Sequence, residues 1–359
     1  MTESTQEELA ALTAAARDLL EDHCTPERLA ASEGRTDLAL WALLAEAGFT
    51  HVGIAEDAGG SGGGIVEAAA LLGVAGEHAA PVPLAESTLL AGWLLALAGL
   101  PQPDGLATTG EGEVSARPVD GGYRLQGTVR RVPAARDAEL VVVLARVDGD
   151  GAARLVVAAV PVAGTSLVEG HNVAGEQRDD VLLDLVVPDV VEVRAGTADE
   201  LRLRGALSRS VLIAGALDRV LRLTVRYAGE RRQFGRPLSA FQAVQQQVAL
   251  LAAEAAAAHA AADGAVEQCA RDGFATPASA FAVAAAKVRT AQAASTAAAI
   301  AHQVHGALGM TREHSLRFST TRLWAWRSEW GSEAQWSQQL GRTAVAAGAD
   351  GVWPLLVGA

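Results

Sequence analysis

Three side chains near residue 230 have the types and the spacing to hold a phosphate-containing molecule. Tyr227, Arg231 and Phe234 are four and three residues apart, a spacing that predicts one shared helix face. The planar fork of an arginine suits the oxygens of a phosphate or a pyrophosphate. Each residue also has an ordinary role at a helix end, Arg231 as a cation near the C-terminus and Phe234 as part of the core. Their combination is what indicates a binding site.

Two stretches of sequence carry a resemblance to a known family. The first, Y-A-G-E-R-R-Q-F-G-R-P-L-S-A-F-Q at 227–242, closely resembles the Y-x-x-x-R-x-x-F-G signature of acyl-CoA dehydrogenases, including the glutamine that follows seven residues after the glycine. The second, Q-V-H-G-A-L-G-M at 303–310, is similar to the Q-x-x-G-G-x-G stretch near the C-terminus of that family. Their separation of about seventy residues suits two intervening helices, and the resemblance covers essentially the whole chain.

The resemblance implies FAD as the cofactor and an acyl-CoA thioester as the substrate. In the family, residues of these two stretches reach the adenosine diphosphate part of the FAD held by a neighbouring subunit, which implies an oligomer. Carried over to this sequence, the cofactor-binding residues are Arg231, Gln233, Phe234, Gln242, Gln303, Val304, His305 and Gly306. The resemblance also points to an electron-transfer flavoprotein as the electron acceptor.

The family's reaction needs a carboxylate that removes a proton alpha to the thioester carbonyl. Counting without gaps from the two motifs, the two positions at which the family places this glutamate fall on Trp330 and Gly205, neither of which can take a proton. A slip of one residue makes Glu329 the first candidate base. Glu333 is the second candidate and Asp218 the third, the alternative being that they are solvated or paired carboxylates.

The part of the family pattern that covers the flavin ring is also altered. Where the family has T-E-P-x-x-G-S-D and W-I-S/T segments, this sequence has D-G-L-A-T-T-G-E-G-E-V-S at 104–115 and V-R-R-V-P at 129–133. A subunit that completes a partner's FAD site explains this loss, and the heteromeric acyl-CoA dehydrogenases of actinobacterial steroid side-chain breakdown resemble that arrangement.

Three interpretations therefore stay open. The chain is an FAD-dependent acyl-CoA dehydrogenase, either a homo-oligomer that uses Glu329 or part of a heterotetramer with a second acyl-CoA dehydrogenase-like subunit. Alternatively it is a catalytically silent partner subunit. The third interpretation is a flavin-free acyl-CoA-binding or scaffold protein.

Several other groups are interpreted as structural. His302 and His305 lie one helical turn apart and lack further metal ligands nearby, while Cys24 and Cys269 form no disulfide framework or metal motif. The glycine-rich 58–64 stretch lacks the residues of a phosphate loop and predicts a turn. A C-terminal tryptophan cluster favours packing between helices over a wide acyl pocket; it consists of Trp324, Trp326, Trp330 and Trp336.

The elements that must position these residues follow from hydrophobic periodicity. Apolar spacing predicts helices at 7–21, 37–47 and 65–76, and valine-rich segments with glycine turns predict strands between 113 and 193. A long helix then runs from 199 to about 234, a capping box of Ser239 and Gln242 starts the next, and Thr276 with Pro277 starts the third.

The expected fold is therefore mostly helical with a small β domain. It consists of an N-terminal helical domain (1–110), a central antiparallel β domain (111–196) and a C-terminal four-helix bundle (197–359), the arrangement that the resemblance also implies.

Composition excludes other classes of function. The net charge of −13 and the lack of any block rich in lysine and arginine argue against nucleic-acid binding. The longest apolar run, 89–100, is too short to cross a bilayer, so we expect no membrane span. The N-terminal sequence lacks the features of a signal peptide, which favours a cytoplasmic location.

Overall fold

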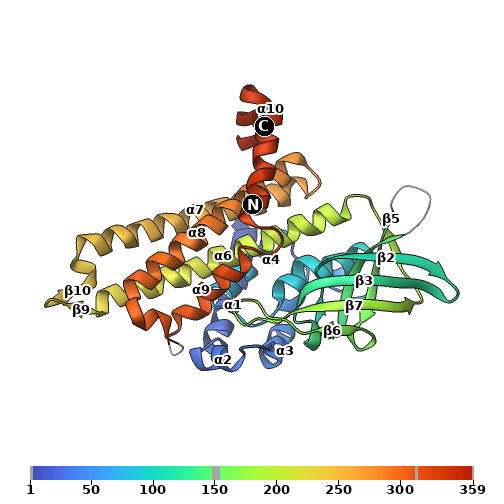
Figure 1. The fold of residues 1–359 in the computed structure, drawn as a ribbon, viewed down its shortest axis with the longest axis horizontal. Helices are drawn as coiled ribbons and strands as arrows, with labels where there is room; N and C mark the ends of the chain where they lie inside the picture. The colour runs from blue at the N-terminus through green and yellow to red at the C-terminus, as the bar shows by residue number, and fades with distance from the viewer. Residues whose placement is uncertain (1–2, 148–153, 312–313, 358–359) are drawn as a thin grey trace. The chain divides into compact units, whose positions relative to one another are not determined.

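The computed structural model describes residues 3–147, 154–311 and 314–357 (Figure 1). Helices come before the sheet in the chain, as the periodicity predicts. They are α1 (Glu3–His23), α2 (Pro26–Ala31), α3 (Leu38–Glu46), α4 (Ile65–Glu77) and α5 (Ala91–Leu97), with 3-10 turns at Phe49–His51 and Glu56–Ala58 and a π-helical turn at Glu86–Leu90.

Local sequence explains where these helices begin and what separates them. Asp37 is the N-cap of α3, and its carboxylate accepts a hydrogen bond of 2.9 Å from the Leu40 backbone N–H. The glycine-rich stretch before α4 forms a turn, as predicted, with left-handed backbone at Gly59, Gly62 and Gly63.

The central segment folds into one sheet. Its strands are β1 (Ala107–Thr108), β2 (Glu111–Val119), β3 (Gly122–Pro133), β4 (Leu140–Val147), β5 (Arg154–Pro161), β6 (Ser166–Val168), β7 (Arg178–Val187) and β8 (Val191–Val193). The order is β6-β7-β3-β2-β4-β5-β8, and β1 pairs with β4. Two pairings, β1 with β4 and β2 with β4, are parallel, and the other pairings of this sheet are antiparallel.

Valine and leucine side chains of these strands form a single buried core on the sheet. They alternate with exposed residues, so that Leu125 and Val129 of β3 are buried while Arg124 and Arg130 are exposed. The D-G-D-G sequence at 148–151, which predicts a hairpin turn, lies outside the described residues. The strands on either side of it, β4 and β5, pair from Leu140 and Pro161 to Val147 and Arg154. The fold class predicted for this segment is confirmed.

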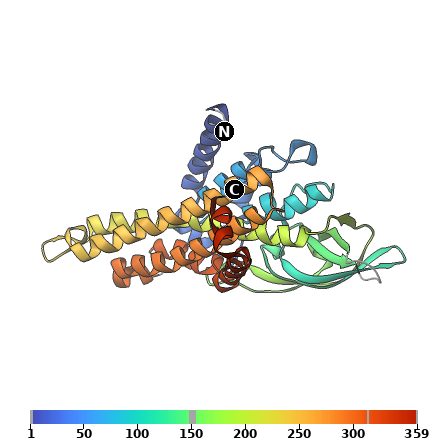
Figure 2. The ribbon, with the colours of Figure 1, turned by 90° about the horizontal axis from the view of Figure 1, so that it is seen from above.

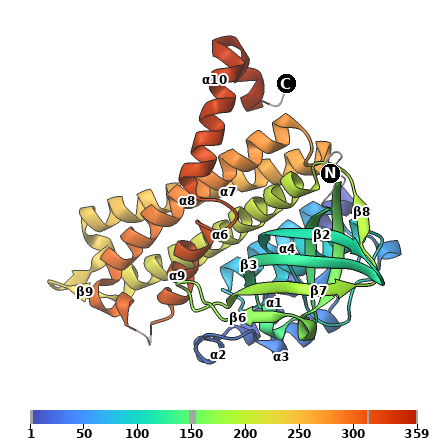
Figure 3. The same cartoon turned by 45° about the vertical axis from the view of Figure 1, so that its right-hand side comes forward.

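The rest of the chain is mostly helical and contains α6 (Thr197–Glu230), α7 (Gln242–Asp272), α8 (Pro277–His305), α9 (Leu316–Trp326) and α10 (Glu333–Val357). The bundle part of α6 runs beside α7 and α8 (Figures 1 and 2), and α7 and α8 pack along their lengths. Thr276 caps α8 as predicted, accepting a 3.1 Å hydrogen bond from the Ser279 backbone N–H. The helix α10 packs on α8 and then leaves the bundle, with a kink at Gly348 (Figure 3).

By contact density the chain divides into two compact units. One contains residues 1–29, 69–80 and 206–359, and the other contains residues 30–68 and 81–205. The three-part division at residues 110 and 196 follows the order of elements and stays a prediction. Within the described residues, no helix has both the length and the apolar character needed to cross a membrane.

In the first unit, α4 and α6 touch through their backbones. A Cβ atom added at Gly215 would lie 1.9 Å from the Gly73 carbonyl oxygen, and one added at Gly76 would lie 2.2 Å from the Leu212 carbonyl oxygen. Cβ atoms do not approach oxygen this closely, so the contact requires glycine at both positions. This contact fixes the separation of the two helices.

We expect Gly215→Ala to destabilise the protein by about 1–3 kcal/mol, because the helices must move apart to admit the methyl group. The matched control is Gly229→Ala on the same helix, where an added Cβ meets no atom within 4 Å. There the higher helix propensity of alanine should stabilise by about 0.5–1 kcal/mol. Denaturant unfolding of both variants measures the difference, and equal effects would contradict the backbone contact.

Candidate functional site

The first motif forms a short hairpin, not the end of a helix. The helix α6 ends at Glu230, and β9 (Arg232–Gln233) pairs with β10 (Arg236–Pro237) around a two-residue turn. Phe234 and Gly235 occupy this turn with φ of 50° and 79°. The prediction that Arg231 and Phe234 share a helix face with Tyr227 was therefore wrong, because two successive left-handed residues end a helix and form a tight hairpin.

Contacts within the hairpin hold its tip in place. The Phe234 ring meets the Phe241 ring edge-on at 6.3 Å, and the Arg236 guanidinium lies 4.1 Å from the centre of the Phe241 ring. Arg232 donates a 3.0 Å hydrogen bond to the Gly235 carbonyl. The tip is thus held in one conformation by its own neighbours.

The predicted cofactor residues of this hairpin face solvent. Phe234 is 92% exposed, and Arg231 and Gln233 are exposed as well. Within the part of the chain that the structure describes, the side chains of Arg231 and Gln233 form no hydrogen bond. Their donors are therefore available to a molecule that lies outside this chain.

Gln242 is exposed at the first turn of α7, but the capping box predicted with Ser239 was wrong. Residues 238–240 form a 3-10 turn, which makes Phe241 the N-cap residue, with no side-chain cap. Instead, the Gln245 side chain donates a 2.9 Å hydrogen bond to the Ser239 carbonyl. The Gln242 side chain therefore does not cap α7.

The second motif lies at the end of α8. Gly306 follows the last residue of α8 and has a φ of 61°. Its backbone N–H donates a hydrogen bond to the His302 carbonyl. Gln303 and Gly306 are exposed, whereas Val304 and His305 are buried. Of these four predicted cofactor residues, the structure presents Gln303 and Gly306 at the surface and places the other two beneath them.

A stack of rings joins the two motifs. The rings of Tyr227 and His305 are 4.5 Å apart and nearly parallel, and His314 meets both rings edge-on. His305 donates a 2.8 Å hydrogen bond to the Ala301 carbonyl through Nδ1. Burial lowers the pKa of His305, and the bond to Ala301 offsets part of that effect. The end of α6 and the end of α8 are thereby fixed side by side.

The first candidate base is engaged in an ion pair. The Glu329 carboxylate accepts a 2.7 Å hydrogen bond from Arg209 Nε, with side-chain exposures of 15% and 2%. Taking a proton would remove the negative charge that pairs with the buried Arg209 guanidinium. The position counted from the motif, Trp330, is buried with φ of 55°, and Gly205 lies within α6.

The other two candidate carboxylates lie elsewhere. Glu333 is the first residue of α10 and is partly exposed. The Asp218 carboxylate accepts a 2.9 Å hydrogen bond from Nε2 of His259 on α7. This hydrogen bond raises the pKa of His259. Asp218 is thus a paired carboxylate whose partner is a histidine.

In the sheet, the hydroxyls of the altered ring-binding segment are already bonded. Thr108 donates to the Pro133 carbonyl at 2.6 Å, and Thr109 donates to the Val142 carbonyl at 2.7 Å. Both threonines are buried. A β-bulge follows Val129 in β3, with left-handed backbone at Arg131. Neither hydroxyl hydrogen is available to a flavin ring.

The tryptophan cluster packs mainly in the interior. Trp326, Trp330 and Trp336 are buried, and Trp336 Nε1 donates a 2.9 Å hydrogen bond to the Trp330 carbonyl. Trp324 is exposed, with the Arg327 guanidinium 4.5 Å from its ring centre. No group of three potential ligands around His302 or elsewhere in the described residues is arranged to hold a metal ion.

Profiles of one family match both helical parts of the chain. The acyl-CoA dehydrogenase N-terminal domain matches residues 6–102, and the C-terminal domain of the same family matches residues 203–328. The chain is 32% identical to the acyl-CoA dehydrogenase IpdE2 of Mycobacterium tuberculosis over 80% of each chain. It is 35% identical to the acyl-CoA dehydrogenase FadE27 of the same organism, over 63% of this chain and 66% of that protein.

Solved structures share the whole fold. A chain of the ChsE4-ChsE5 complex from Mycobacterium tuberculosis superimposes with a TM-score of 0.82 and 27% identity, over 95% of this chain and 97% of that one. A chain of the Tcur3481-Tcur3483 steroid ACAD gives a TM-score of 0.83 and 27% identity, over 96% and 99%. The fold, the two motifs and these matches together show that the chain belongs to the acyl-CoA dehydrogenase family.

Proposed function

We propose that the chain is one subunit of a heteromeric FAD-dependent acyl-CoA dehydrogenase. In this assembly it binds the adenosine diphosphate part of FAD, and a second acyl-CoA dehydrogenase-like subunit holds the flavin ring and the catalytic base. The observation that carries the proposal is the exposed surface made by the hairpin and the end of α8, joined by the stack of Tyr227 on His305.

The residues of this surface fit the ADP part of FAD. Arg231 offers a planar fork of donors for a pyrophosphate, and Gln233 and Gln303 add amide groups. Phe234 presents an aromatic face for an adenine or ribose edge, while Gly306 permits close approach of the backbone. FAD, when bound, supplies the hydride acceptor for oxidation of the thioester substrate.

The exposure of Phe234 favours binding across a subunit boundary. A phenylalanine side chain that is 92% exposed gains nothing from burial in this chain, and it is also held in a left-handed backbone conformation. A second subunit with its cofactor would cover the ring and remove it from water. Homomeric and heteromeric assemblies both provide such a cover, so the choice between them depends on the other half of the site.

The part of the site that would supply the base and cover the flavin ring favours a heteromer. The best-placed carboxylate, Glu329, is paired with Arg209, and the hydroxyls of Thr108 and Thr109 are bonded to the backbone. A homomer would repeat these features in every site. A partner with its own base and ring-binding segment supplies what this chain lacks.

The names of the related structures guide the choice of substrate and partner. One is a complex of two different proteins, and the other is described as a steroid ACAD. We therefore propose an acyl-CoA with a bulky, steroid-derived acyl group as the substrate to test first. An electron-transfer flavoprotein is the proposed electron acceptor.

Co-expression with a neighbouring acyl-CoA dehydrogenase-like gene tests the assembly. We expect the chain alone to purify without flavin, and the co-purified complex to contain one FAD for each pair of different chains. Absorbance of released flavin and quantified protein bands give this ratio. One FAD per chain in the protein purified alone would reject the heteromer in favour of a homomeric enzyme.

In that complex, Arg231→Ala and Phe234→Ala should each weaken FAD binding by about tenfold or more, because each removes a contact worth at least about 1.4 kcal/mol. Arg226→Ala is the control, since Arg226 is an exposed arginine near the end of α6, five residues before Arg231. Flavin fluorescence on titration of the apo complex measures the affinity. Equal losses in Arg231→Ala and Arg226→Ala, with no loss in Phe234→Ala, would show that net charge, not this surface, governs binding.

We expect Glu329→Gln to lower stability by about 3 kcal/mol, because it removes the carboxylate that pairs with the buried Arg209. The turnover number of the assembled complex should stay within about twofold, well short of the 10²-fold or greater loss expected for a general base. Glu333→Gln serves as the matched control on stability. A large fall in turnover with unchanged stability would instead identify Glu329 as the base.

A further inference from the structure

Three histidine rings lie together where the two motifs meet. His305 stacks on Tyr227 with ring centres 4.5 Å apart, and the His314 ring meets the His305 ring edge-on at 4.9 Å. His302 precedes His305 on α8, and its Nε2 is 3.0 Å from the Thr320 hydroxyl of α9. This histidine cluster, formed by His302, His305 and His314, connects the end of α6, the end of α8 and the start of α9.

The hydrogen bond of His314 requires an uncharged ring. Its Nδ1 accepts a 3.2 Å hydrogen bond from the backbone N–H of Leu316, the first residue of α9. A nitrogen that accepts such a bond carries no proton of its own. Protonation of His314 at Nδ1 would replace the acceptor by a second donor, and the start of α9 would lose this contact.

Two other ring nitrogens of the cluster are buried and unpartnered. His302 Nδ1 and His305 Nε2 form no hydrogen bond with any residue that the structure describes. The other nitrogen of His305 already donates to the Ala301 carbonyl at 2.8 Å. A proton on either unpartnered nitrogen would place a positive charge inside the bundle, which is strongly unfavourable unless a negative group compensates it.

The surroundings of the cluster supply no such compensation. Burial is the largest cause that lowers the pKa of each of the three rings. His302 and His314 lower the pKa of His305 further, and the Ala301 and Leu223 carbonyls act in the opposite direction. Within the described residues, no carboxylate or guanidinium acts on the pKa of any of the three rings. Charges gained by the cluster would therefore act mainly on one another.

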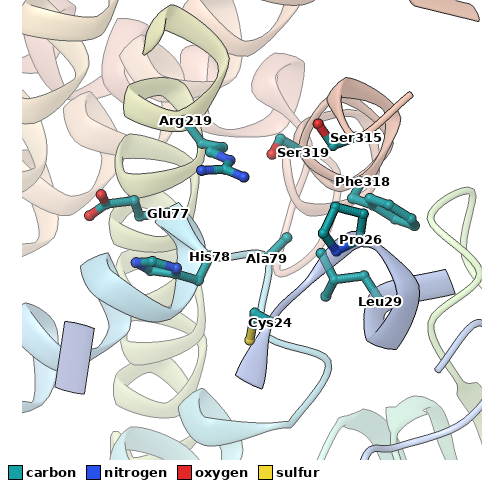
Figure 4. Close-up of a pocket in the computed structure, with 10 residues that line it drawn as sticks. All are labelled: Cys24, Pro26, Leu29, Glu77, His78, Ala79, Arg219, Ser315, Phe318 and Ser319. Atoms are coloured by element: carbon teal, nitrogen blue, oxygen red, sulfur yellow. The ribbon is translucent and has the colours of Figure 1, made fainter. Parts of the chain in front are cut away.

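The start of α9 has free space on another side. Ser315, Phe318 and Ser319 line a small pocket (Figure 4), while Thr320 of the same segment contacts the cluster. Protein interiors are otherwise closely packed, so a hollow beside a helix allows it to shift without a clash. This segment can therefore move when the rings of the cluster become charged.

We propose that the histidine cluster is a pH-sensitive switch: its neutral rings hold the ends of α6 and α8 together, and their protonation separates these ends. Like charges on neighbouring rings repel, and the Tyr227–His305 stack opens. The folded chain binds these protons less readily than the unfolded chain does. The closed junction is therefore fully stable above the ordinary histidine pKa of 6.5 and loses stability as the pH falls below it. That opening also disrupts FAD binding rests on the proposed function.

Hydrogen exchange of the purified chain tests the switch. Peptides covering 223–237 and 300–311 are compared at pH 7.5 and pH 5.5, after correction for the intrinsic pH dependence of exchange. We expect the protection of both to fall about tenfold or more at pH 5.5, because the junction opens. A peptide of β7, in the other compact unit, should keep its protection. Unchanged protection of the two junction peptides would overturn the proposal.

The variant His305→Phe keeps an aromatic ring for the stack but cannot take a proton. Its junction peptides should stay protected at pH 5.5. The control His171→Phe replaces an exposed histidine of the other compact unit and should lose protection as the wild type does. A loss in His305→Phe equal to that of the wild type would contradict the switch, and the wild-type comparison does not depend on the folding of any variant.

The co-purified complex tests the consequence for the cofactor. We expect FAD affinity to fall about tenfold or more between pH 7.5 and pH 5.5, and His305→Phe to remove this dependence. An affinity that rises on acidification would overturn the proposal, because the charged rings would then attract the pyrophosphate. A complex that binds no FAD at pH 7.5 would reject the proposed function, and hydrogen exchange of the chain would still decide the switch.

Discussion

The stack of Tyr227 on His305 is the contact on which the surface proposed to bind FAD depends. The two motifs lie about seventy-five residues apart in the sequence, and this pair of rings fixes the end of α6 beside the end of α8 at 4.5 Å. The hairpin begins four residues after Tyr227, and Gly306 directly follows His305. The stack therefore sets the position of Arg231 in one motif relative to Gln303 in the other, the two residues that the proposed function places on one dinucleotide.

The two histidine rings of the stack are uncharged, and His305 is buried, which suits a place beneath the surface proposed to bind a pyrophosphate. Burial lowers the pKa of both His305 and His314, so these rings pack as uncharged aromatic groups near neutral pH. Positive charge at this end of the bundle is then supplied by exposed guanidinium groups such as that of Arg231. The histidine rings therefore serve packing, and the exposed arginines are the groups proposed to bind the ligand.

Periodicity in the sequence predicts most of the fold, because long amphipathic helices and valine-rich strands carry strong signals. The helices at 65–77 and 277–305 and the strands on either side of residues 148–151 agree with it. Periodicity does not predict the hairpin at 232–237, because Arg231 and Phe234 have helical spacing. The hairpin depends instead on left-handed backbone at Phe234 and Gly235.

The same limit applies to the candidate site. The family motifs indicate candidate FAD-binding residues. The structure exposes Gln303 and buries Val304 and His305, a difference that follows from packing and not from the motif. The pairing of Glu329 with Arg209 joins residues 120 positions apart. Spacing within a single sequence does not predict an ion pair between residues so far apart. From the sequence alone, Glu329 is therefore a candidate base.

Carboxylates near arginine serve charge pairing in several parts of this molecule. Glu329 pairs with Arg209, Glu77 with two arginines, and Asp179 of β7 with Arg136. A base for proton abstraction has to be free to accept a proton near neutral pH, and an ion pair with arginine opposes this. The chain combines the exposed surface proposed for a dinucleotide with an acid, Glu329, that is bound to a cation. The proposed heteromer, in which a different chain performs the proton transfer, accounts for both properties.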